Sequence, residues 1–332
     1  MSVLTPSLTL KKPLNRRTTI AGLVASLLAP AISWAQSDKT VKFILPLSAG
    51  SGVDGIARAA SNAIGKALGQ TVVTENQPGA GGVVGTAAMI KSAPDGLTLS
   101  LVSNNHVIFP AVLKSLPFDP LVDITPIAVI GATPMVLVVN AKLPVKNLAE
   151  FTALLKANPG KYNFASSGNG TILHLAAEIY KEKSQTFSTH IPYRGFGPMV
   201  QDIIGGQVDW GVGALPAVLG QIKSGNLKAL CIASSARSAA APDIPTSAEA
   251  GLPSFLVEGW FAAIGPKGLP AEQVKRINAA LTTAFDTTEV KDAMAKQGNS
   301  IKISTPEFAK DFFSKELKLY ADTVKRAGVV AQ

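Results

Sequence analysis

The sequence of 332 residues has few of the side chains that build metal, redox or nucleic-acid sites. The single cysteine, Cys231, excludes an internal disulfide and a thiolate zinc cluster. Three histidines, His106, His174 and His190, leave little material for a metal site. Aromatic residues make up 6%, and lysine and arginine are scattered instead of forming the basic stripe typical of a nucleic-acid surface. We therefore expect no metal, no cofactor and no nucleic-acid partner.

Long apolar runs are also scarce. The longest, of about 13 residues between Ile20 and Ile32, is shorter than the ~20 residues that a membrane-spanning helix needs. It follows the pair Arg16-Arg17, and Ser33-Trp34-Ala35 supplies small residues for cleavage before Gln36. Residues 1–35 are therefore interpreted as a cleaved export signal to the periplasm, with an uncleaved anchor as the alternative. The arginine pair leaves the twin-arginine route open.

The remaining composition is that of a chain that buries a core. Hydrophobic residues make up 47% and charged residues 16%, and the length suits two domains. The net charge of +9 is uneven, because four basic residues and no acid precede Asp38. Without those four, 27 basic and 22 acidic residues remain, a net charge of +5.

Short apolar runs alternate with helical periodicities along the chain. This alternation predicts parallel β-sheets covered by helices. A proline-rich stretch after residue 240 precedes a late α/β segment, which we expect to pack back on the first unit. The predicted domains are 36–138 with 257–332, and 139–256, joined by two crossings around a ligand cleft. The predicted strands are 41–47, 71–75, 97–102, 135–140, 163–166, 207–210, 227–233 and 258–264, and the main helices are 56–67, 79–91, 148–157, 173–180, 271–285 and 306–326.

The first glycine loop matches a dinucleotide-binding fingerprint. Gly50, Gly52 and Gly55 follow a strand in the spacing G-x-G-x-x-G, and Glu75 lies 20 residues further on. A periplasmic NAD(P)-dependent oxidoreductase is therefore an alternative function. The turn before Gly50 is longer than in that fold, however, and no catalytic group accompanies it.

The same loop has a second interpretation. A helix N-terminus exposes unpaired N–H groups, so Ser51 and the following amides are suited to a small carboxylate. Asp54 would cap the helix or order the loop, because its charge would repel an anion.

Several longer motifs, in order along the chain, resemble one receptor family. This chain resembles the Bug receptors, the extracytoplasmic substrate-binding proteins of tripartite tricarboxylate transporters. The similarity covers essentially all of the chain after the export signal. The motifs are residues 46–54, 75–82, 94–99, 165–176, 192–195, 206–209 and 245–253.

The resemblance implies a type II periplasmic-binding-protein fold of two α/β lobes joined by two hinge crossings. It implies a non-enzymatic receptor that captures a small organic carboxylate and delivers it to membrane transporter subunits, and we expect a monomer. Asn104 and its neighbours after the third strand should border the cleft. The implied ligand-binding residues are Leu47, Ser48, Ala49, Ser51, Asp54, Ser103, Asn105, His106, Ser167, Gly168, Asn169, Thr171, Tyr193, Arg194, Gly195 and Phe196.

The chain also departs from the family pattern. Gly50-Ser51 replaces a pair of glycines, and the segment 104–106 is more polar than usual. The segment after Asp209 lacks an acid that would suit an ammonium, which weakens the case for an amino-acid ligand. His174 and Glu178 share a helix face and are interpreted as structural, as is His190. No G-x-S-x-G elbow frames a serine, which argues against a hydrolase.

Overall fold

The computed structural model describes residues 40–331, which lie in one compact unit. The predicted export signal, residues 1–35, lies outside the described residues. Among the helices of residues 40–331, none combines the length and the apolar character that crossing a bilayer requires.

Within those residues, ten strands form one sheet in the order β2-β1-β3-β9-β4-β7-β5-β6, with β8 and β10 also pairing with β4. The strands are β1 (Val41–Leu45), β2 (Val72–Asn76), β3 (Thr98–Ser103), β4 (Ile124–Asn140), β5 (Asn163–Ser166), β6 (Thr189–Pro192), β7 (Trp210–Ala214), β8 (Leu227–Ile232), β9 (Glu258–Pro266) and β10 (Ser300–Ile301). The helices are α2 (Gly52–Leu68), the 3₁₀ turn η1 (Ala80–Gly82), α3 (Val83–Ile90), α4 (Asn105–Val112), α5 (Leu148–Ala157), α6 (Ile172–Ser184), α7 (Phe196–Gly205), α8 (Leu215–Lys223), α9 (Ala271–Asp286), α10 (Thr288–Gln297) and α11 (Pro306–Arg326).

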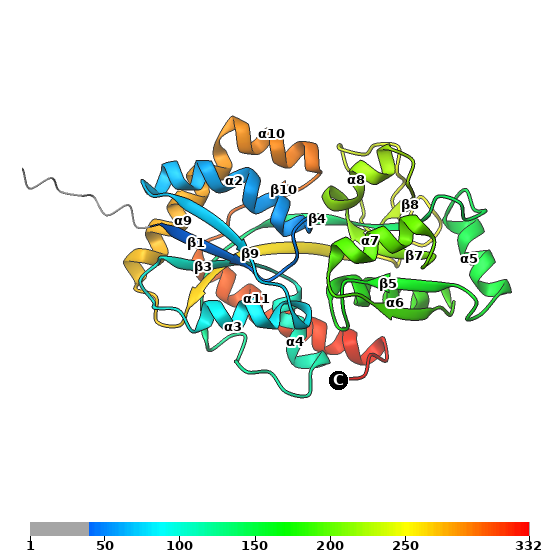
Figure 1. Ribbon diagram of the computed structural model, residues 1–332, viewed down its shortest axis with the longest axis horizontal. Coiled ribbons are helices and arrows are strands. Elements are labelled where there is room, and N and C mark those ends of the chain that lie inside the picture. The colour runs from blue at the N-terminus through cyan, green and yellow to red at the C-terminus, as the bar shows by residue number, and fades with distance from the viewer. Residues whose placement is uncertain (1–39, 332) are drawn as a thin grey trace, which may run out of the picture. The chain divides into compact units, whose positions relative to one another are not determined.

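The long strand β4 belongs to both halves of this sheet (Figure 1). Its residues 124–134 pair with β9, whereas residues 135–140 pair with β7 and β8. We call β1, β2, β3, β9, β10 and residues 124–134 the first half. The second half contains β5 to β8 and residues 135–140.

The prediction of parallel sheets is right for the outer strands and wrong for the centre. β1 is parallel to β2 and β3, and β5 is parallel to β6 and β7. β9 is antiparallel to β3 and β4, and β4 is antiparallel to β7 and β8. The outer strands are each followed by a crossover helix, which gives parallel pairing. β4 and β9 instead run along each other in opposite directions.

Most predicted elements are present. The bounds of α5, β5 and α11 match the prediction, and Gly69 ends α2 in the left-handed conformation with φ +65°. The strand predicted at 207–210 is wrong, because β7 begins at Trp210. The preceding residues end α7 instead, where the Gln207 and Val208 amides both donate to the Asp202 carbonyl. The short helices α4, α8 and α10 and the first part of β4 were not predicted.

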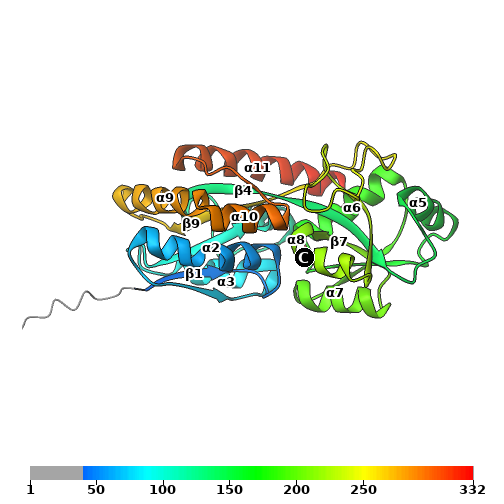
Figure 2. The ribbon, with the colours of Figure 1, turned by 90° about the horizontal axis from the view of Figure 1, so that it is seen from above.

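The core consists mainly of two apolar clusters. One is confined to the first half, where α2 and α9 pack on each other. The other fills the second half and continues into the first through Ile108, Trp260 and Phe313. Helix α11 packs on α4 and runs along β4 (Figure 2). Apolar packing is therefore continuous along the strands that connect the halves.

Candidate functional site

A cavity of about 770 Å³ is lined by residues from both halves of the sheet. The first half contributes the loop between β1 and α2 (residues 46–51, the first loop), the glycine-rich segment 78–82, and residues at the ends of β3 and β9. The second half contributes the loop between β5 and α6 (residues 167–171, the second loop) and the segment 192–196. Both loops lead directly into helix N-termini at the cavity wall.

The first loop is held by the first turn of α2. Ser51 is the N-cap, and its hydroxyl accepts the Asp54 amide at 3.3 Å. The Asp54 carboxylate accepts the Gly50 amide at 3.0 Å and the Arg58 Nε at 2.9 Å. Gly50 has φ +78°, which favours glycine here. Asp54 is therefore buried and orders the loop, the role expected when an acid lies next to an anion site.

Two amides at the start of α2 remain available. Gly52 and Val53 both line the cavity, and within residues 40–331 their N–H groups have no hydrogen-bond partner. These amides lie at the positive end of the helix dipole, so they favour an anionic group.

The second loop is built in the same way. Thr171 is the N-cap of α6, and its hydroxyl accepts the His174 amide at 3.4 Å. The Gly170 amide donates to Nδ1 of His174 at 3.0 Å. Leu173, in the first turn of α6, lines the cavity, and its N–H also has no partner in the described part of the chain. A second set of anion donors therefore lies in the second half.

Two hydrogen bonds join the halves at these helix starts. The Asn105 side chain donates to the Gly81 carbonyl at 2.9 Å and accepts the Ile172 amide, the first of α6, at 2.9 Å. Ser48 Oγ accepts the Phe196 amide, the first of α7, at 3.1 Å. Polar side chains of the first half therefore cap two helices of the second half.

The electrostatics of the cavity favour an anion. Among the described residues that line it, Arg194 is the one with a charged side chain, and it has no ion pair within residues 40–331. Tyr193 also lines the cavity, and its hydroxyl donates to Asp202 at 2.7 Å. No acidic side chain of the described chain lines the wall, so an ammonium group has no counter-charge there.

Most predicted site residues lie together at this cavity. Asn105, Ala49 and Asp54 are not among the lining residues: Asn105 and Asp54 are buried behind the wall, and Ala49 is exposed in the first loop. The predicted residues that line the cavity are Leu47, Ser48, Ser51, Ser103, Ser167, Gly168, Asn169, Thr171, Tyr193, Arg194, Gly195 and Phe196.

His106 also lies away from the cavity wall. Only 1% of it is exposed, its ring stacks on Phe118, and its Nε2 lies 2.7 Å from the Pro120 carbonyl. Burial lowers the pKa of His106 to about 4, and the Pro120 carbonyl offsets this only in part. This geometry gives His106 a packing role.

Some residues that line the cavity were not predicted from the sequence as site residues. The segment 79–82 was noted as a family motif but not as a site, although its glycines were a usable signal. Thr133, Met135 and Trp260 lie on β4 and β9 at the connection between the halves. The Thr133 hydroxyl is buried without a partner in the described chain. No local pattern marks these residues, because strand pairing between distant segments creates their position.

The dinucleotide fingerprint is not supported by the position of its acid. The Glu75 carboxylate pairs with Lys42 Nζ at 2.8 Å and accepts Gln77 Nε2 at 2.6 Å. Those contacts lower its pKa, the Lys42 contact most. Glu75 is not among the residues that line the cavity.

The comparisons with known proteins agree on a family. Residues 56–332 match the model of the tripartite tricarboxylate transporter family receptor. Protein BugT of Bordetella pertussis is 37% identical over 306 residues, which are 92% of this chain and 94% of that protein. The structure of MatC from Rhodopseudomonas palustris with bound malate is 30% identical with a TM-score of 0.81, over 86% of this chain and 98% of that one.

A second R. palustris structure, with adipate, is 25% identical with a TM-score of 0.85, over 88% of this chain and 98% of that one. These similarities confirm the periplasmic-binding-protein fold. The chain belongs to the tripartite tricarboxylate transporter receptor family, to which the Bug proteins also belong.

Proposed function

We propose that the protein is a non-enzymatic periplasmic receptor that binds a small organic carboxylate in the cavity between the two halves. The observation that carries this proposal is the donor set of the cavity. Within residues 40–331, unpaired amides of Gly52 and Val53 lie on one side and that of Leu173 on the other, with Arg194 and no acid in the wall. Each helix start contributes ~0.3–1 kcal/mol to binding an anion.

The ligand is best described as an aliphatic acid with two carboxylates. Donors from both halves would hold the two ends of such a molecule. The similarity to structures named for bound malate and adipate supports this class. The absence of an acid among the described lining residues argues against an amino acid.

The two halves would act as lobes, with the divisions at residues 36–138 with 257–332 and at 139–256 that the sequence predicts. Ligand contacts made from both sides would stabilise the closed arrangement, since a ligand shifts an equilibrium only by its differential affinity. The predicted residues that line the cavity would then contact the ligand, whereas Asp54 and Asn105 would hold the loops.

Delivery to the membrane subunits of a tripartite transporter is the family's implied role. A monomeric receptor exported by residues 1–35 would carry the ligand to them. We expect pull-down of the transporter's membrane subunits to depend on a bound carboxylate.

The ligand class is tested by thermal shift and calorimetry of residues 36–332 with malate, adipate and their dimethyl esters. We expect the acids to raise the melting temperature and the esters to have no effect. A shift with NAD(P) and none with any carboxylate would overturn this proposal in favour of the oxidoreductase.

A further inference from the structure

The two loops are held by the same kind of hydrogen bond. In each, the residue before the N-cap donates its amide to the side chain four positions later, in the first turn of the helix. In the first loop these are Gly50 and Asp54, at 3.0 Å; in the second they are Gly170 and His174, also at 3.0 Å. The acceptor is a carboxylate in one case and an imidazole nitrogen in the other.

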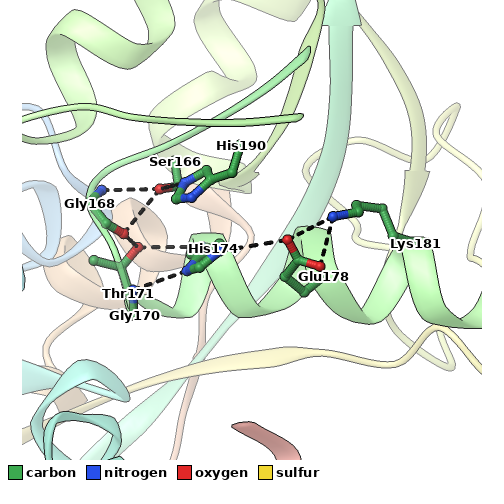
Figure 3. Close-up of polar contacts among 8 residues, drawn as sticks. All are labelled: Ser166, Gly168, Gly170, Thr171, His174, Glu178, Lys181 and His190. Carbon is green, nitrogen blue, oxygen red and sulfur yellow. Dashed lines mark hydrogen bonds and ion pairs between the residues drawn. The ribbon is translucent and has the colours of Figure 1, made fainter. Parts of the chain in front are cut away.

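His174 is packed so that its ring cannot rotate freely. It is 7% exposed, and its ring stacks on that of His190 with centroids 3.8 Å apart and planes at 10° (Figure 3). His190 Nε2 lies 2.6 Å from Ser166 Oγ, which donates to the Gly168 carbonyl and accepts the Gly168 amide. His174 therefore bonds the second loop directly, whereas His190 bonds Ser166, the last residue of β5, which in turn bonds Gly168 of that loop.

The protons can be assigned from these contacts. Because the Gly170 amide donates to His174 Nδ1, that nitrogen carries no proton, so the proton of the neutral ring is on Nε2. Nε2 faces Glu178 Oε1 at 3.7 Å. Since the Ser166 hydroxyl donates to Gly168, His190 Nε2 is the donor to Ser166. Protonation of His174 would put a hydrogen on Nδ1 and break the bond to Gly170.

We propose that His174 is a positioning residue for ligand binding: its neutral ring accepts the Gly170 amide and thereby holds the second loop in the conformation that meets the ligand carboxylate. The ligand-binding part rests on the proposed function. An imidazole accepts the Gly170 amide without adding negative charge next to an anion.

The charges around His174 come from two elements. Glu178 and Lys181 lie on α6, with Lys181 Nζ 2.8 Å from the Glu178 carboxylate, and His190 lies on β6. β5 contributes the uncharged ring of Phe164, which stacks on His174 with centroids 6.0 Å apart. Burial, and then the positive charge of His174, lower the pKa of His190 to about 3. His190 therefore stays neutral, and its Nε2 proton is available to Ser166.

Two substitutions distinguish the hydrogen-bond acceptor of His174 from its aromatic ring. His174→Phe keeps an aromatic ring for stacking but removes the acceptor; we expect about tenfold weaker binding of malate or adipate at pH 8. His174→Asn keeps an acceptor near the position of Nδ1. We expect this variant to bind with an affinity within about threefold of wild type at the same pH.

Tyr180→Phe is the matched control. Tyr180 is fully buried on the same helix and bonds Thr152 at 2.8 Å. The variant should lose stability and keep wild-type affinity. Wild-type affinity in His174→Phe, or affinity in His174→Asn as weak as in His174→Phe, would overturn the proposal.

A readout without ligand separates this inference from the proposed function. Nitrogen NMR of the unliganded protein should show His174 unprotonated at Nδ1. Exchange of the Gly170 amide should be slow in wild type and His174→Asn and at least about tenfold faster in His174→Phe. A protein that binds neither acid but shows this pattern would refute the receptor proposal alone. A protonated Nδ1, or unchanged Gly170 exchange in His174→Phe, would refute the role of His174.

Discussion

The two cavity loops have the same backbone design and different chemistry. Each has an N-cap hydroxyl, Ser51 or Thr171, and a first-turn side chain that accepts the amide before the cap. In the first loop that acceptor is Asp54, whose charge Arg58 balances. In the second it is His174, which carries no charge when it accepts.

This difference separates backbone geometry from local charge. The first loop is held by a carboxylate whose charge Arg58 balances, whereas the second is held by an imidazole nitrogen that adds no negative charge beside the helix N-terminus. The second loop is therefore expected to tolerate a close ligand carboxylate without a neighbouring arginine to balance its own acceptor.

The largest effect is expected from Thr171→Asp. The new carboxylate keeps the cap but adds a negative charge at the cavity wall, so we expect affinity for malate or adipate to fall at least about a hundredfold. Ser51→Asp should act similarly if both loops contact the ligand. Titration calorimetry measures both. Thr305→Asp is the control, because Thr305 caps α11 with the same geometry and does not line this cavity. Unchanged affinity in Thr171→Asp would remove the second loop from the site.

Asp54→Ala tests the first loop. It leaves the Gly50 amide and Arg58 without their partner, so we expect about tenfold weaker binding and a stability loss of ~1–3 kcal/mol. Asp54→Asn, which retains an acceptor, should recover much of the affinity in titration calorimetry. Wild-type affinity in Asp54→Ala would contradict the role of Asp54 in ordering the first loop.

Asn105→Ala tests the connection between the loops. Without the side chain, the Ile172 amide and the Gly81 carbonyl lose a shared partner that joins the halves. We expect ligand to dissociate about three to ten times faster in stopped-flow measurements, as the closed arrangement is less stable. Asn147→Ala removes a helix cap far from the cavity and should leave the rate unchanged.

The smallest effect on affinity is expected from His106→Gln, because His106 does not line the cavity. Its effect is on stability. The folded pKa of about 4 lies below the ordinary 6.5, so the unfolded chain takes up the proton first. Stability from this group is present above pH 6.5 and is lost as pH falls toward 4, by roughly 1.4 kcal/mol per pH unit. In denaturant melts, the variant should reduce the pH dependence of the free energy of unfolding. The pH dependence that remains is expected to come from His190. An unchanged slope would contradict the burial argument.

Local patterns predicted those parts of the molecule that local forces determine. Gly69 ends α2 and the helix α11 has its predicted bounds, because caps and periodicity lie within each segment. Both glycine loops were recognised for the same reason. The direction of β9 and the first part of β4 depend on pairing between distant segments, which spacing does not contain.

The same distinction between local patterns and distant contacts holds for the roles of individual site residues. Asp54 was expected to cap the helix or order its loop, because its charge would repel an anion. His174 was interpreted as one member of a helix-surface pair with Glu178, because the return contact to Gly170 requires the loop conformation. His106 lies on α4, an unpredicted helix, so the direction of its side chain could not be inferred.

The position of Trp260 has a practical consequence. The described residues contain two tryptophans, and Trp210 is fully buried in the second half, away from the cavity wall. Trp260 is among the residues that line the cavity, and its indole N–H donates to Glu316 of α11 at 2.6 Å. We therefore expect its fluorescence to respond to a ligand at the junction of the halves. Titrations would then follow occupancy without a label, with Trp260→Phe as the blank.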